Sequence, residues 1–103
     1  MLLLDDDLRA RLPPLHAQEA ESEPWIYAKF TAPGTRWDWY VMEGEAQGED
    51  FLFFGFITGQ QKDFKCFLLS ELESVRTAVG SSVERDLHFT EGRLTDVVPA
   101  PDS

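Results

Sequence analysis

Residues 51–58 read FLFFGFIT, a run in which both faces of an extended chain would be apolar. Side chains of a strand point alternately to the two faces of a sheet, so a strand of this composition is normally covered on both sides. The run therefore predicts a central strand, and the rest of the chain must supply two covering layers. It is also far shorter than the roughly 20 residues that span a bilayer, so we expect a cytoplasmic protein without a membrane partner.

Alternating patterns before and after this run predict further strands. Residues 25–31 (WIYAKFT) alternate, and residues 36–43 send Trp37 and Trp39 to one face and Asp38, Tyr40 and Met42 to the other. Residues 64–69 (FKCFLL) return as a fourth strand. We expect Trp37 and Trp39 to belong to the core.

Two glycines carry specific predictions. Pro33 and Gly34 suit the centre of a type II turn between the first two predicted strands. Gly55 lies inside the apolar run, where glycine indicates a bulge or the close approach of another group.

Helical signals flank the predicted strands. Residues 5–12 begin with carboxylates, and residues 15–21 follow two prolines as a second short helix. Residues 70–80 start with a capping box of Ser70 and Glu73 and end at Gly80. Residues 81–90 alternate as an edge strand.

The resulting order is α-β-β-β-β-α-β. It predicts an α+β fold, with a mostly antiparallel sheet of four to five strands, an N-terminal helical segment and one helix near the C-terminus. We expect one domain over residues 1–92 and a flexible C-terminal tail over residues 93–103.

The chain is strongly acidic, with a net charge of −10. The acidic excess lies in residues 1–50 and 81–103, whereas residues 51–80 carry three acids and three bases. Such a field repels nucleic acid and anionic membranes, so direct DNA or RNA binding is not expected. It would attract proteins with basic grooves, and those usually bind nucleic acid.

Residues that could carry chemistry are few. Glu84, Asp86 and His88 project from one face of the predicted edge strand, but a facial triad needs two histidines and a carboxylate. We interpret them as a solvated polar face and predict neither a metal nor a cofactor. Cys66, the one cysteine, could be a nucleophile, but its apolar strand favours a small buried side chain.

The second sheet face is where we expect a binding surface. Two short helices are available to cover two faces, so aromatic surface beside Asp38, Tyr40 and Met42 could stay open to a partner. The predicted partner-binding residues are Asp38, Tyr40, Glu43, Glu45, Glu49, Asp50, Glu84 and Asp86. The alternative is that these acids only solubilise the surface.

Several stretches together resemble the domain of unknown function 2958 family: PWIYAKFTAPGTRWDWYVMEGE, FFGFITG, FLLSELESVR and VERDLHF. The resemblance spans roughly residues 2–90, and it departs at GQQKDFKCF, where the family usually has a Gly-Pro-Glu-Leu-Gly-like turn. It implies a small bacterial protein of plasmids, phages or integrative elements, where such proteins serve maintenance, regulation or evasion of host defence. It implies no catalytic residues.

Three functional hypotheses follow. The first is a non-enzymatic protein-interaction module of a mobile element that blocks a nucleic-acid-binding host defence effector, such as a restriction or CRISPR complex. The second is a small ligand-binding or enzymatic domain with an aromatic pocket, whose polar groups are Glu84, Asp86 and His88 or Cys66. The third is a homodimeric accessory protein of plasmid or phage maintenance.

Overall fold

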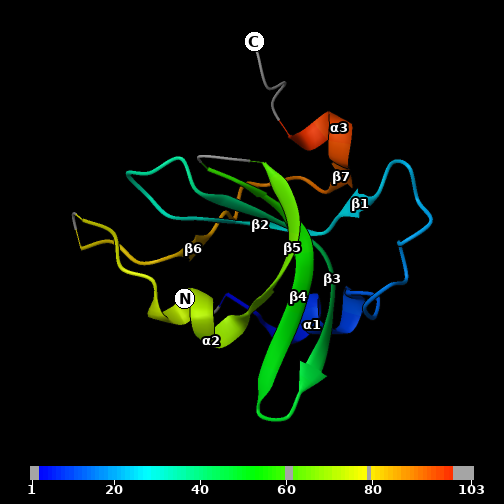
Figure 1. Ribbon diagram of the computed structural model, residues 1–103, viewed down its shortest axis with the longest axis horizontal. Helices are drawn as coiled ribbons and strands as arrows, with labels where there is room; N and C mark the ends of the chain where they lie inside the picture. The colour runs from blue at the N-terminus through cyan, green and yellow to red at the C-terminus, as the bar shows by residue number, and fades with distance from the viewer. Residues whose placement is uncertain (1–2, 60–61, 79, 99–103) are drawn as a thin grey trace.

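The computed structural model describes residues 3–59, 62–78 and 80–98. Its central feature is a five-stranded antiparallel sheet in the order β5-β4-β3-β2-β6 (Figure 1). The strands are β2 (Ala28–Thr31), β3 (Asp38–Gln47), β4 (Asp50–Thr58), β5 (Asp63–Leu68) and β6 (Glu84–Arg85). The predicted α+β class and antiparallel sheet are confirmed.

A small second sheet and three short helices complete the fold. The small sheet pairs β1 (Trp25–Ile26) with β7 (Gly92–Arg93), and the helices are α1 (Asp6–Arg11), α2 (Leu69–Ser74) and α3 (Leu94–Val97). In Figure 1, α3 lies with β1 and β7 toward one end of the large sheet, while α1 and α2 lie toward the turn of the β3–β4 hairpin. No helix in the described residues is long and apolar enough to cross a bilayer.

The apolar run forms β4, which is central as predicted. Phe53 is fully buried on what we call the first face, where it packs edge-on against Phe30 at a ring distance of 5.5 Å. Leu8 and Leu12 of the α1 segment and Leu72 of α2 complete that core. The opposite, second face carries Tyr40, Met42, Phe54 and Phe56.

The prediction for the tryptophans is correct for Trp39 and wrong for Trp37. Trp39 is buried on the first face, but Trp37 is 41% exposed. Because β3 begins at Asp38, the strand alternation does not extend to Trp37. Its ring instead lies over Gly59 and stacks on Trp39 at 6.2 Å.

Both glycine predictions are confirmed. Gly34 has a φ of 82°, and the Thr35 N–H donates to the Ala32 carbonyl at 3.1 Å, as a type II turn requires. Opposite Gly55, the β3–β4 register shifts between Val41 and Glu43, which is a β-bulge.

Four predicted elements differ in extent. Residues 25–31 divide between two sheets, and residues 15–21 form successive turns instead of a helix. The edge strand within 81–90 is confirmed only at Glu84–Arg85. The predicted tail, residues 93–103, contains the second residue of β7 and all of α3, while residues 99–103 lie outside the described residues.

The helix predicted over residues 70–80 ends at Ser74, and its capping box is not the predicted one. The Glu71 carboxylate accepts from the Leu68 N–H at 2.8 Å, so the cap lies two residues earlier in the chain than the predicted pair of Ser70 and Glu73. Gly80 has a φ of 83° but closes a separate turn, in which its N–H donates to the Thr77 carbonyl.

Candidate functional site

One end of the second face is covered by the C-terminal segment. Phe89, Leu94, Val97 and Val98 pack against the buried side chains of Ile26, Tyr40 and Met42. The Leu94 N–H donates to the Pro24 carbonyl at 2.9 Å, which joins α3 to the chain just before β1. This segment is the covering layer that β4 requires on that side, and the sequence prediction missed it.

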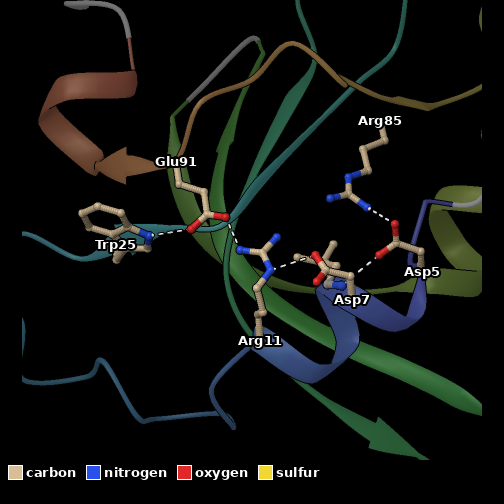
Figure 2. A network of polar contacts seen from close by, with 7 residues as sticks. Asp5, Asp7, Arg11, Trp25, Arg85 and Glu91 are labelled. Carbon is tan, nitrogen blue, oxygen red and sulfur yellow. Dashed lines mark hydrogen bonds and ion pairs between the residues drawn. The ribbon is translucent and has the colours of Figure 1, made fainter.

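A polar network holds this arrangement to the N-terminal helix. Its members are Asp5, Asp7, Arg11, Trp25, Arg85 and Glu91 (Figure 2). The Arg11 guanidinium contacts the Glu91 carboxylate, and the second Glu91 oxygen accepts from the Trp25 indole N–H at 3.0 Å. α1 is therefore linked to β1 and to the residue that precedes β7.

Asp5 forms the other branch of the network. Its carboxylate accepts from the Leu8 N–H at 2.8 Å as the cap of α1 and lies 3.1 Å from Arg85 Nη1 of β6. The hydrogen bond from Leu8 and, to a lesser extent, the positive charge of Arg85 lower the pKa of Asp5 below its ordinary value.

The uncovered end of the second face forms a groove of about 540 Å³. Its apolar lining consists of Leu15, Pro24, Met42, Phe54, Phe64 and Leu94. Phe64 is 42% exposed, and its ring lies 6.2 Å from that of Phe54 in a stacked arrangement. Aromatic surface on the second face is thus open.

Cys66 also lines the groove and is exposed, so the prediction of a buried cysteine is wrong. The reason is its position on β5, an edge strand whose second-face side chains have no covering layer among the described residues. On the first face of the same strand, Phe67 is buried.

Polar residues of the groove come mainly from the segment between α1 and β1. They are His16, Gln18, Glu19, Glu21 and Ser22, together with Glu43 of β3. Glu19 and Glu21 have side-chain exposures of 74% and 55%. They form an acidic rim, which the sequence prediction missed because it placed this segment in a helix.

Glu43 and Gln18 attach this segment to the sheet, and we call the pair the Gln18–Glu43 bracket. Glu43 is 2% exposed, and its two oxygens accept from the backbone N–H groups of His16 at 2.8 Å and Gln18 at 2.7 Å. The Gln18 amide donates to the carbonyls of Trp25 and Met42 at 3.0 Å each and accepts from the Trp25 N–H at 2.7 Å. The wall of the groove is therefore fixed by five hydrogen bonds.

The β-bulge explains how a glutamate reaches this position. Glu43 pairs with Phe54 because Met42 is the extra residue of the bulge. In a regular ladder Glu43 would oppose Phe53 and point into the apolar first-face core. The bulge places the Glu43 carboxylate on the second face, within hydrogen-bond distance of two backbone N–H groups.

The eight predicted partner-binding residues do not form one surface. Tyr40 and Glu43 are buried, so neither side chain is available to a partner in this structure. Asp50 accepts from the N–H groups of Ser70 at 3.1 Å and Phe51 at 2.8 Å, and the Ser70 hydroxyl contact is the main cause that lowers its pKa. It positions the start of α2.

The other predicted acids lie in separate places. Glu45 accepts from the Leu15 N–H at 3.1 Å beside the bracket, whereas Glu49 is exposed in the β3–β4 turn. Glu84 is exposed on β6, and Asp38 is half-buried at the start of β3. Only Glu43 of the eight lines the groove.

Asp86 is engaged near Tyr40. Its carboxylate accepts from the His88 N–H at 2.9 Å and lies 4.0 Å from Lys29 Nζ, which in turn lies 5.5 Å from the centre of the Tyr40 ring. Within residues 3–59, 62–78 and 80–98, no group of three or more His, Cys, Asp or Glu residues is placed to hold a metal ion.

Burial raises the pKa of the Tyr40 phenol to about 12, and the charges of Asp38 and Asp86 add to the effect. The ordinary value is 10, so the unfolded chain loses this proton first as pH rises. Stability contributed by the neutral phenol is therefore complete below pH 10 and is lost between pH 10 and about 12.

The titration of Tyr40 can be isolated by subtracting the phenolate absorbance of Tyr40→Phe from that of the wild type. This difference should rise near pH 12, and a rise near pH 10 would contradict the burial of the phenol.

Comparison with known proteins gives one match. No curated protein and no solved structure matches the chain. A family model with the description "Protein of unknown function (DUF2958)" matches residues 3–99, which is nearly the whole chain and confirms the resemblance noted above. The chain belongs to this family of proteins of unknown function.

Proposed function

We propose that the chain is a non-enzymatic interaction protein that binds a basic protein through the groove and its acidic rim. The observation that carries this proposal is an open aromatic groove beside two exposed carboxylates, Glu19 and Glu21. The net charge of −10 gives the same preference at longer range. Proteins with matching basic surfaces commonly bind nucleic acid, and a host defence effector encountered by a mobile element is the partner class we favour.

Two polar side chains of the groove, Glu43 and Gln18, are engaged in holding its wall, which favours binding over catalysis by these two groups. Both oxygens of Glu43 accept backbone N–H groups, and the Gln18 amide makes three hydrogen bonds of its own. These groups are therefore used to hold the groove wall. A general base must instead be free to reach a substrate proton.

The charge of the rim also bears on self-association. Two copies would bring Glu19 and Glu21 of each groove toward the other copy, with a net charge of −10 on both chains. Like charges across an interface are unfavourable. We therefore favour a heterologous partner over a homodimer, and light scattering at several concentrations should report a monomer.

Glu19→Lys tests the acidic rim. When immobilised, this variant should retain much less of the basic partner protein from a nuclease-treated bacterial lysate than the wild type does. Retention by the wild type should fall as the salt concentration rises. The control is Glu73→Lys, which makes the same charge change at an exposed position of α2, away from the groove. Equal losses for both variants would reduce the effect to net charge and contradict the proposed site.

A further inference from the structure

We propose that the groove recognises a segment of the partner protein in which one large apolar side chain lies between arginines or lysines. The inference rests on the proposed function and specifies its ligand. The apolar side chain would enter the groove, and the flanking cations would meet its rim.

The preference for a large apolar side chain follows from the aromatic lining of the groove. Phe54 is half-buried and Phe64 is exposed, and Phe56 packs edge-on against Phe64 at 4.9 Å. Met42 and Leu94 add to this apolar lining. A large apolar side chain placed here would remove apolar surface from water on both sides of the contact. A polar side chain would gain less, because the nearby Glu43 and Gln18 groups are already hydrogen-bonded.

The preference for flanking arginines or lysines follows from the acidic rim of the groove. Among the described residues that line the groove there are three glutamates and no lysine or arginine. Glu21 lies 3.8 Å from Arg93, but the nearest partner of Glu19 is His16 Nδ1 at 3.7 Å, which is a cation only when protonated. Glu19 is thus an exposed carboxylate able to pair with an incoming arginine or lysine.

Aromatic rings elsewhere in the chain show the same chemistry. Arg9 lies over Phe51, Lys29 over Tyr40 and Arg93 over Trp25, at 5.0 to 5.5 Å from the ring centres. No such cation lies over Phe64 within the part of the chain that the structure describes. An arginine beside the inserted apolar residue could occupy that ring face.

The shape of the site suits a linear segment. β5 is an edge strand, so no further strand closes the groove beyond Phe64 and Cys66 among the described residues. The opposite wall is held by the Gln18–Glu43 bracket. A chain can therefore cross the groove with one side chain inserted and its neighbours outside.

Cys66 provides a reporter for occupancy in the unmodified protein. It is the one cysteine of the chain, it is exposed and it lines the groove. Alkylation by iodoacetamide, followed by intact mass, therefore measures access to the groove. The probe is a fluorescein-labelled peptide with the core Arg-Phe-Arg, whose binding is measured separately by anisotropy.

At a peptide concentration about ten times its Kd, alkylation should slow about tenfold, as expected for one-site occupancy. Matched peptides with serine for phenylalanine, or glutamate for both arginines, should give little protection. Binding without protection of Cys66, or no binding at all, would overturn this inference. So would equal protection by the serine peptide, or protection by free indole alone, which would indicate a small-molecule pocket.

Phe64→Ala tests the contact directly, with Trp37→Ala as the control. The two rings are matched in exposure, at 42% and 41%, but Trp37 lies outside the groove. Phe64→Ala should weaken the Arg-Phe-Arg peptide at least about tenfold, in line with a buried aromatic contact, and Trp37→Ala should not. Equal affinities would overturn the inference, while the proposed function would still be judged separately by the Glu19→Lys and Glu73→Lys comparison.

Discussion

Gly55→Ala should lower the free energy of unfolding by about 3 kcal/mol, the upper part of the usual range for overpacking. A Cβ atom at this position would lie 2.0 Å from the Tyr40 carbonyl oxygen and 3.0 Å from its carbon. Both are backbone atoms of the adjacent strand, so neither can move aside without breaking the β3–β4 pairing. Urea denaturation followed by tryptophan fluorescence measures the loss.

Gly48→Ala is the control for this experiment. Gly48 has a φ of 62° in the β3–β4 turn and open space around it, so alanine there meets only backbone strain. That strain should cost about 1 kcal/mol. If Gly55→Ala were no more destabilising than Gly48→Ala, the close approach at the bulge would be contradicted.

Glu43→Ala should lower the free energy of unfolding by about 3 kcal/mol as well. The substitution removes the carboxylate that accepts from the His16 and Gln18 N–H groups. A hydrogen bond to a charged acceptor contributes about 1.5–3 kcal/mol, and two such bonds are lost. Water entering beside the groove will offset part of this loss. Urea denaturation again gives the value.

Glu45→Ala is the matched control for Glu43→Ala. Glu45 is exposed and accepts one bond, from the Leu15 N–H at 3.1 Å, so its loss should cost less than about 1 kcal/mol. Amide hydrogen exchange should accelerate at His16 and Gln18 in Glu43→Ala, and much less so in Glu45→Ala. Equal stability of the two variants would show that the bracket does not hold the groove wall.

The sequence predicted the central part of the fold because that part obeys local rules. An apolar run on both faces requires burial on both faces, and β4 is indeed central. Pro33 and Gly34 specify their turn by backbone geometry alone. The prediction for residues 15–21 failed because a distant residue decides their conformation: the Glu43 carboxylate binds the backbone N–H groups of His16 and Gln18, and the segment takes turns. α2 ends at Ser74, where Val75 takes an extended conformation, although the sequence continues in a helical pattern.

The candidate site was predictable in part. The alternation of β3 and β4 correctly assigned Tyr40 and Met42 to a second face with less cover than the first. What covers that face could not be deduced, because the cover is α3 and its flanking residues, whose position depends on the two-residue pairing of β7 with β1. The sequence wrongly predicts that Glu43 belongs to an exposed acidic surface, because the residues of β3 give no direct sign of the bulge at Met42. That bulge leads to the burial of the Glu43 carboxylate.

The central claim is that the uncovered end of the second face is the binding surface of this protein. Hydrogen exchange by mass spectrometry, on the chain alone and saturated with the basic protein it retains, tests this most directly. We predict slower exchange in residues 14–24 and 62–68, which flank the groove, and unchanged exchange in α2. Slower exchange confined to α1 and α2, with the groove unaffected, would contradict the account.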